Sequence, residues 1–178
     1  MKRAMAVFAV FVLCFGLLTG CGNPASGSNN SETSGNSGIS GGDKQYAVTV
    51  TAPEGWEAID GSGTLLRYKN GSGDFWVKQG FSGGTVESDI EYYQERENAG
   101  GYNITWEDAK DEVINGINAK YLKYIVDAGS LKMRYDVYFI QQDAALFTLV
   151  CLTNPDSDYG VLEADYKTLL DSLEITEK

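Results

Sequence analysis

The chain has 178 residues, of which 25 are acidic and 14 are basic, so its formal net charge is −11, and it contains no histidine. A surface with this excess of negative charge is repelled by nucleic acid and by anionic polymers, so direct binding to either is excluded unless cations bridge the contact. The lack of histidine excludes Ser-His and Cys-His nucleophile pairs and most zinc sites.

The first 20 residues are a predicted signal peptide. Lys2 and Arg3 follow the initiating methionine, and the run from Ala4 to Leu18 carries no charge. A basic region followed by an apolar region is typical of an export signal. The apolar run is shorter than the roughly 20 residues that a membrane-spanning helix needs. The sequence therefore predicts export and removal of residues 1–20.

The tetrapeptide Leu18-Thr19-Gly20-Cys21 ends this signal. It resembles the lipobox of bacterial lipoproteins, in which the signal is cut just before a cysteine that carries diacylglycerol. The resemblance implies that Cys21 is the lipid attachment site and that the protein is anchored to the extracytoplasmic face of the cell membrane. Two or three acyl chains on one residue make such an anchor effectively permanent. The alternative is an ordinary cleaved secretory signal with an incidental cysteine.

Residues 21–44 begin with this cysteine and continue mainly in Gly, Ser and Asn, a composition that cannot bury a core. They are a predicted flexible tether with a reach of roughly 25–30 Å. Residues 45–178 are enough chain for one domain with a proper core. Loss of Lys2 and Arg3 with the signal makes the mature chain two charges more negative than the precursor.

The first third of this domain is predicted as a β-meander. Tyr46 to Ala52 alternates apolar residues with threonine, and a Pro-Glu-Gly segment ends this strand. Leu65 to Lys69 and Asp74 to Phe81 are two further strands, joined across an Asn-Gly pair that favours a hairpin turn.

The pattern changes to a helical period from Val86 to Asn98, with Val86, Ile90 and Tyr93 on one face. Ser88 and Glu91 have the spacing of an N-terminal capping box, and the pair Gly100-Gly101 ends the helix. The apolar stripe predicts that this helix packs on the sheet.

Four long strand patterns follow: Ile104 to Ile114, Ile117 to Val126, Leu131 to Gln141 and Ala145 to Thr153. The short connections between them predict antiparallel neighbours. The last strand is apolar on both faces, as in a central strand covered on two sides, and Cys151 within it is predicted to be a buried apolar residue.

A helix from about Tyr159 to Leu173 closes the chain, with Asp158 as its predicted N-cap. Its predicted buried stripe consists of Leu162, Tyr166, Leu169 and Leu173. The predicted fold class is therefore α+β, an antiparallel sheet of about six or seven strands with helices packed on it as an α/β/α sandwich.

Three segments resemble PsbP-like domains: Val50 to Trp56, with a proline two residues before a Gly-Trp pair; Glu112 to Tyr121, a hairpin with an Asn-Gly turn; and the closing Tyr166 to Leu173. The resemblance spans residues 46–176. This superfamily includes a subunit of the photosynthetic oxygen-evolving complex, a Ran GTPase-binding import factor and bacterial lipoproteins of undefined role. It implies a binding or assembly module without catalysis, and no ligand motif of the family carries over to this chain.

A calcium loop is the metal site that the pattern comes nearest to. Asp156 and Asp158 alternate with other residues after Asn154, and Asp165 falls at the twelfth position of such a loop. However, Tyr159 stands where an EF-hand requires glycine. We expect no metal site, with Asp156 and Asp158 as the candidates for one, because a turn that caps the last helix explains the same residues.

Carboxylates also gather at Glu107, Asp108, Asp111 and Glu112, and paired carboxylates can hydrolyse glycosides. On a single strand, Glu107 and Asp111 share one face while the other two share the opposite face. This arrangement is typical of a solvated strand edge that resists edge-to-edge pairing. No catalytic residue is predicted.

Aromatic residues around the Gly100-Gly101 turn form a predicted interface patch, which consists of Tyr92, Tyr93, Tyr102 and Trp106. Exposed rings on a secreted domain can stack on sugars or on the apolar side chains of a partner. Burial in the core is the alternative for each ring.

The leading hypothesis is a membrane-anchored extracytoplasmic lipoprotein that is not an enzyme, needs no cofactor and acts through contacts with a protein partner. The first alternative is a receptor that binds a solute or a divalent cation with its acidic surface. The second is a carboxylate-based hydrolase.

Overall fold

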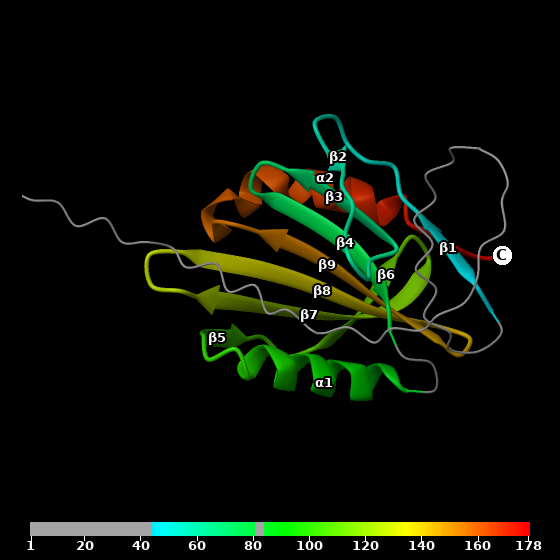
Figure 1. Ribbon diagram of the computed structural model, residues 1–178, viewed down its shortest axis with the longest axis horizontal. Coiled ribbons are helices and arrows are strands. Elements are labelled where there is room, and N and C mark those ends of the chain that lie inside the picture. Colours follow the sequence, from blue (N-terminus) through cyan, green and yellow to red (C-terminus); the bar gives the residue numbers. More distant parts are fainter. Residues whose placement is uncertain (1–43, 81–83) are drawn as a thin grey trace, which may run out of the picture. The chain divides into compact units, whose positions relative to one another are not determined.

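The computed structural model describes residues 44–80 and 84–178 (Figure 1). Its strands are β1 (Tyr46–Thr49), β2 (Glu57–Ala58), β3 (Leu66–Asn70), β4 (Gly73–Gln79), β5 (Asn103–Trp106), β6 (Lys110–Ile114), β7 (Ile117–Asp127), β8 (Lys132–Gln142), β9 (Ala145–Thr153) and β10 (Glu174–Glu177). Its helices are α1 (Val86–Asn98), α2 (Tyr159–Asp171) and the short 3-10 helix η1 (Asp156–Asp158). The predicted signal peptide, Cys21 and the tether up to residue 43 lie outside the described residues. Neither α1 nor α2 has the length and apolar character of a membrane span.

The main sheet has eight antiparallel strands in the order β2-β3-β4-β9-β8-β7-β5, with β6 also paired to β7. β9 lies between β4 and β8 and is buried on both faces, as predicted. The predicted burial of Cys151 in this strand is confirmed, and burial raises the pKa of its thiol well above the usual value. Cys151 is therefore a protonated packing residue at neutral pH.

α1 has the predicted bounds, but its cap differs from the prediction. Thr85 is the N-cap in an extended conformation, its hydroxyl accepts a hydrogen bond from the Ser88 N–H, and the Ser88 hydroxyl accepts one from the Thr85 N–H. The capping box is thus Thr85–Ser88, and the predicted Ser88–Glu91 pair is wrong because Ser88 is already inside the helix. Ile90 and Tyr93 are buried against side chains of β7 and β8, as predicted.

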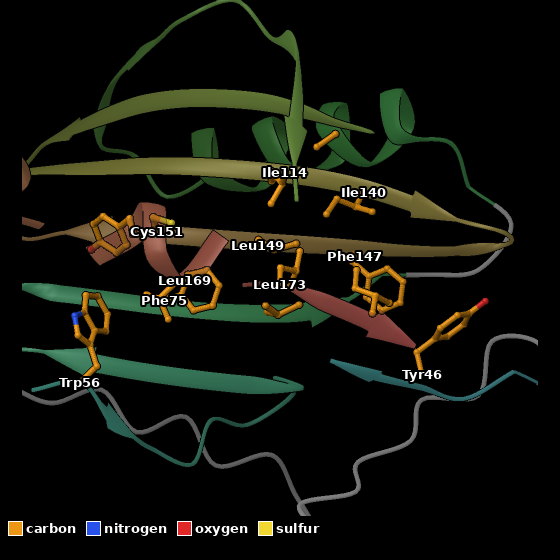
Figure 2. Close-up of a cluster of buried hydrophobic side chains, with 14 of the residues drawn as sticks. Tyr46, Trp56, Phe75, Ile114, Ile140, Phe147, Leu149, Cys151, Leu169 and Leu173 are labelled. Atoms are coloured by element: carbon orange, nitrogen blue, oxygen red, sulfur yellow. The ribbon is translucent and has the colours of Figure 1, made fainter. Parts of the chain in front are cut away.

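α2 packs on the opposite face of the sheet, and Figure 2 shows its core. All four residues of the predicted stripe, Leu162, Tyr166, Leu169 and Leu173, are buried. They pack with Phe75 and Leu149, which alternate along β4 and β9 with the side chains that face α1. The α/β/α arrangement is confirmed, with eight strands in the main sheet. Asp158 occupies the N-cap position of α2 but makes no side-chain capping bond.

β1 is not part of the predicted meander. It pairs with β10, with Tyr46 opposite Glu177 and Thr49 opposite Glu174, in a separate two-stranded sheet. Tyr46 of β1 and Ile175 of β10 are buried in the hydrophobic core that includes side chains of α2. The meander prediction is wrong for the first strand because its partner lies at the far end of the sequence, and local patterns carry no information about that pairing.

The predicted strand from Ile104 to Ile114 is interrupted. β5 and β6 pair with successive stretches of β7, and Glu107 to Ala109 lie between them as an irregular segment. Such an interruption in an edge strand hinders pairing with another chain. Glu107 is therefore outside the strands and Asp111 is in β6, so the two do not share one face of a single strand as predicted.

Trp56, the second residue of the Gly-Trp pair near the start of the domain, is buried. We call its surroundings the Trp56 corner. Trp56 packs edge to face on Tyr166 at 5.5 Å, and its indole N–H donates a hydrogen bond to Asp165 at 2.8 Å. A Cβ atom on Gly73 would lie 2.9 Å from the Trp56 ring, so the corner requires glycine there. The segment from Val50 to Trp56, one of the three that resemble PsbP-like domains, thus contributes Trp56 to the packing of β4 against α2.

Candidate functional site

α1 covers only part of its face of the sheet. It packs on side chains of β7 and β8, whereas Trp76 and Lys78 of β4 and Thr148 of β9 lie on the same face beside the helix. The space between α1 and these strands is a groove of 390 Å³. We call it the α1 groove, and its lining includes Trp76, Lys78, Asp89, Tyr92, Arg96 and Tyr135.

Tyr93 and Tyr135, which line the α1 groove, pack on further aromatic rings behind them. Tyr124 lies between Trp106 and Tyr135, with ring centroids at 4.4 and 4.6 Å. Tyr93 of α1 meets Tyr124 edge to face, and the two hydroxyl oxygens are 3.3 Å apart. The guanidinium of Arg96 lies 4.7 Å from the centre of the Tyr93 ring. These contacts hold α1 on the sheet and give the groove a rigid wall.

The predicted aromatic patch is divided between core and surface. Tyr93 is buried, and burial raises its pKa to about 12, while Trp106 packs on Tyr124 and donates a hydrogen bond to Asn98 at 3.1 Å. Tyr92 is 54% exposed and lines the α1 groove, whereas Tyr102 is 59% exposed and does not line it. The structure therefore brings Tyr92 and Tyr93 together in the groove and leaves Tyr102 and Trp106 outside its lining.

Asp89 is the acidic group on the α1 side of the groove. It lies in the first turn of the helix, where a negative charge is favourable, and its carboxylate accepts a hydrogen bond from the Thr148 hydroxyl at 3.2 Å. Burial raises its pKa above the usual value, although the Thr148 hydrogen bond and the charge of Arg96 act in the opposite direction. Asp89 can accept hydrogen bonds from a bound molecule.

Two cations also line the α1 groove, Arg96 from α1 and Lys78 from β4. Arg96 is engaged by Glu97 at 2.7 Å. Lys78 forms no ion pair with an acidic side chain in residues 44–80 or 84–178. The groove thus combines half-buried aromatic surface with an acceptor in Asp89 and a donor in Lys78, which are groups suited to binding.

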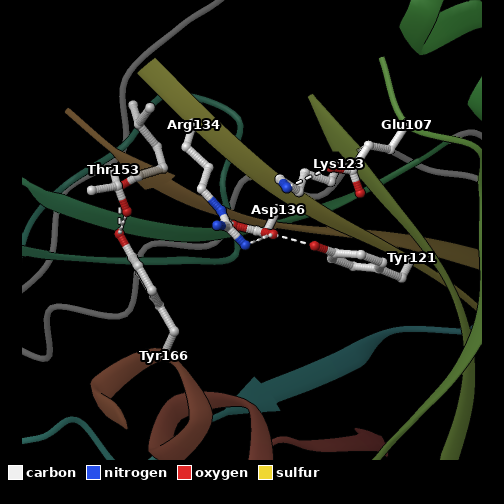
Figure 3. Close-up of polar contacts among 8 residues, drawn as sticks. Glu107, Tyr121, Lys123, Arg134, Asp136, Thr153 and Tyr166 are labelled. Atoms are coloured by element: carbon white, nitrogen blue, oxygen red, sulfur yellow. Dashed lines mark hydrogen bonds and ion pairs between the residues drawn. The ribbon is translucent and has the colours of Figure 1, made fainter. Parts of the chain in front are cut away.

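A second groove, of 410 Å³, lies on the other face between α2 and β6 to β8, and we call it the α2 groove. Figure 3 shows that its polar side chains bind one another. Arg134 donates to both oxygens of the buried Asp136 at 2.7 and 3.0 Å, the Tyr121 hydroxyl donates to the same carboxylate, and Arg134 also covers the Tyr159 ring. The guanidinium, the carboxylate and the hydroxyl of this network bind one another rather than a ligand. Such a network is typical of a structural contact between a sheet and a helix.

The candidate calcium ligands do not converge. Within the described residues, no group of three or more acidic, cysteine or histidine side chains is placed to hold a metal ion. Asp158 accepts a hydrogen bond from Ser157 at 3.3 Å, and Asp165 accepts one from Trp56. Asp165, the residue at the twelfth position of the calcium-loop pattern, therefore belongs to the contact with Trp56.

Two of the four clustered carboxylates at the edge of the sheet pair with lysines of β7. Lys123 pairs with Glu107, and Lys120 pairs with Asp111 at 2.6 Å (Figure 3 shows the first pair). The lysine holds the pKa of Glu107 below its usual value. A general acid needs the opposite shift, so Glu107 is unsuited to that role.

Sequence reasoning missed Trp76, Lys78 and Tyr135 as groove residues. The alternation in β4 does place Trp76 and Lys78 on one face. The sequence does not reveal that this part of the face lies beyond the edge of α1, so a half-buried tryptophan there could not be told from a core residue.

No protein-family model and no protein with a curated description matches this chain. Solved structures do match it. LpqN of Mycobacterium tuberculosis, described as involved in cell envelope biogenesis, has a TM-score of 0.55 at 12% identity, with 76% of this chain and 87% of that chain covered. Cyanobacterial PsbP of Synechocystis sp. PCC 6803 has a TM-score of 0.54 at 15% identity, with 80% and 96% covered.

The Ran-binding protein Mog1p of Saccharomyces cerevisiae matches as well, with a TM-score of 0.51 at 8% identity and coverage of 74% of this chain and 95% of that chain. At these identities the comparisons establish the fold alone. They agree with the antiparallel sheet and the two helices on opposite faces. The described domain therefore has the PsbP-like α+β fold that cyanobacterial PsbP and Mog1p share.

Proposed function

We propose that this protein is a lipid-anchored extracytoplasmic binding module that docks a protein partner along the α1 groove without catalysing a reaction. The observation that carries the proposal is the exposed Tyr92 beside the half-buried Trp76 and Tyr135 in a groove with a rigid aromatic wall. Aromatic side chains in concave, partly desolvated surfaces supply much of the binding energy of protein interfaces.

The anchor is supported by the sequence of the N-terminus. The apolar signal, the lipobox at Cys21 and the Gly/Ser/Asn tether follow one another and end where the folded domain begins at β1. The domain's first strand is tied to its last strand, and Lys44 binds Asp143 and Glu177 at 3.0 and 2.9 Å.

The absence of catalysis is supported by the chemistry of the grooves. Glu107 and Asp111, the two carboxylates of the candidate hydrolase pair, form ion pairs with lysines, and the side chains of Arg134, Asp136 and Tyr121 in the α2 groove bind one another. Among the structural neighbours, Mog1p is described as Ran-binding, so one protein of this fold acts by binding another protein.

Site-specific photocrosslinking in the intact, lipidated protein tests the docking surface. A photoreactive phenylalanine derivative, which keeps an aromatic ring, replaces Tyr92 in one variant and Val161 in the control, because Val161 is 81% exposed on α2 on the other face. We expect one defined crosslinked partner from position 92, lost when Trp76→Ala is added, and none from position 161. Equal crosslinking from both positions, or no dependence on Trp76, would contradict docking in the α1 groove.

A separate experiment tests the anchor. Metabolic labelling with a palmitate analogue should mark the wild-type protein, and Cys21→Ala should abolish both the label and recovery in the membrane fraction. Cys151→Ala is the control, since Cys151 is buried and cannot carry a lipid. A Cys21→Ala protein that is still labelled would contradict the proposed anchor.

A further inference from the structure

The α1 groove continues into a smaller pocket over β3 and β4. This pocket has a volume of 150 Å³, and it shares Trp76 and Lys78 with the groove. Its remaining lining is Gly61, Ser62, Thr64 and Arg67. We call it the Arg67 pocket. Its lining is cationic and hydroxyl-bearing in a protein whose net charge is strongly negative.

Arg67 is held in place from two directions. Its guanidinium donates two hydrogen bonds to Asp74, one of them at 2.8 Å, and it lies 5.6 Å from the centre of the Trp76 ring. Asp74 is only 4% exposed, so this pair is fixed on one side by the sheet. Because the charges of Arg67 and Asp74 compensate one another, the net positive charge of the pocket comes from Lys78.

The turn above Arg67 closes the pocket. Thr64 donates from both its N–H and its hydroxyl to the Gly61 carbonyl, at 3.2 and 2.8 Å. A Cβ atom on Gly61 would lie 3.2 Å from the Arg67 side chain and closer still to Thr64, so only glycine lets the turn approach this far. The turn therefore brings the Ser62 and Thr64 side chains to the edge of the two cations.

We infer that the Arg67 pocket binds a carboxylate of an acidic peptide segment, while an apolar side chain next to that carboxylate lies on Trp76 in the α1 groove. This inference rests on the proposed function and names the chemistry of the partner. Lys78 and the free edge of the Arg67 guanidinium supply charged donors, and Trp76 supplies apolar surface shared by both cavities.

The mixed charge of the combined surface favours a peptide over a uniformly anionic polymer. Lys78 and Arg67 attract negative charge, whereas Asp89, which is bound to Thr148 opposite Lys78 on β9, repels it and accepts hydrogen bonds. A peptide offers a carboxylate, an apolar side chain and N–H donors in one short segment. A chain of phosphodiesters would place negative charge against Asp89. The overall negative charge of the protein matters less here, since charges beyond about 8 Å are screened at physiological salt.

Peptide selection on the intact lipoprotein in nanodiscs tests this inference. We expect a displayed random library to be enriched in sequences with Asp or Glu within two residues of Leu, Phe or Trp. A synthetic peptide from the selection should bind Lys78→Gln about tenfold more weakly than wild type, because one charge-assisted hydrogen bond is lost. The matched control is Lys167→Gln, which removes an exposed lysine from α2 and should change nothing.

Replacing the acidic residue of the peptide by its amide should weaken binding to wild type by a similar factor and add little to Lys78→Gln. Lys78 is chosen over Arg67 because Arg67 pairs with the buried Asp74, so its loss would disturb folding. Equal binding of the acid and amide peptides, or full binding by Lys78→Gln, would overturn the inference.

Inorganic phosphate is the second probe. Phosphate that binds with the same dependence on Lys78, without competition from the selected peptide, would also overturn the peptide assignment in favour of a phosphate ligand. Failure of these tests would leave the proposed docking function standing if position 92 still crosslinks to its partner. Loss of that crosslink would remove the docking function itself.

Discussion

The two faces of the sheet carry grooves of similar size but of different character. In the α2 groove, Asp136 is buried and is bound by Arg134 and Tyr121, so its charges and hydroxyls are satisfied within the fold. In the α1 groove and the adjoining Arg67 pocket, Tyr92 is exposed and Lys78 has no ion-pair partner among the described residues. The volume of a groove alone therefore does not identify a binding site. A better indicator is the presence of polar and aromatic side chains that have no partner within the fold.

The strongest test of this contrast is removal of Asp136. Asp136→Ala would leave Arg134 without its carboxylate in a mostly buried position, and breaking a buried ion pair costs about 3–5 kcal/mol. We expect the free energy of unfolding, measured by urea denaturation, to fall by that amount. Asp171→Ala, which removes the exposed partner of Lys167, is the control and should change stability little. A stable Asp136→Ala protein would mean that the α2 network is not structural.

The neighbouring tyrosines of α1 offer the next test. Tyr93→Ala removes a buried ring that touches Tyr124 and Phe139, and we expect a loss of about 3–4 kcal/mol in the free energy of unfolding. Tyr92→Ala should stay within about 0.5 kcal/mol of wild type while partner binding is lost. Similar stability losses for both changes would place Tyr92 in the core and weaken the contrast between the faces.

The smallest effect concerns the ionisation of Asp89. Since burial raises its folded-state pKa above the unfolded value, the folded state binds this proton more tightly, and stability is lost as pH rises through the folded pKa. Asp89→Asn removes this dependence. We therefore expect the stability of wild type relative to Asp89→Asn to decline as the pH rises above about 4, the usual pKa of an aspartate. An identical pH profile for the two proteins would show that Asp89 is not desolvated in the groove.

Much of the fold could be predicted from local patterns. The bounds of α1 and β9, the burial of Cys151 and the four-residue stripe of α2 all agree with the prediction. Each follows from periodicity and burial within one segment, which a sequence displays directly. The capping box was misplaced by three residues because Thr85 and Ser88 both have capping side chains, and only the backbone conformation distinguishes them.

The candidate site was predicted only in part. Tyr92 and Tyr93 were identified, but their opposite environments were not, since adjacent helix positions differ in burial according to how the helix rotates on the sheet. Trp76 and Tyr135 were missed because they come from strands far away in the sequence. Trp106 was included, although its ring belongs to the stack on Tyr124.

The sequence by itself determined the periodicity of each element, the α+β class and the charge of the chain, because these depend on residues close together in the chain. Only the tertiary structure decided that β1 pairs with β10, that β5 and β6 are separate strands, and that α1 leaves part of β4 and β9 uncovered. The physical reason is that strand pairing and helix placement depend on how whole elements fit together. The positions of Lys78 and Arg67 beside the Trp76 ring follow from that fit.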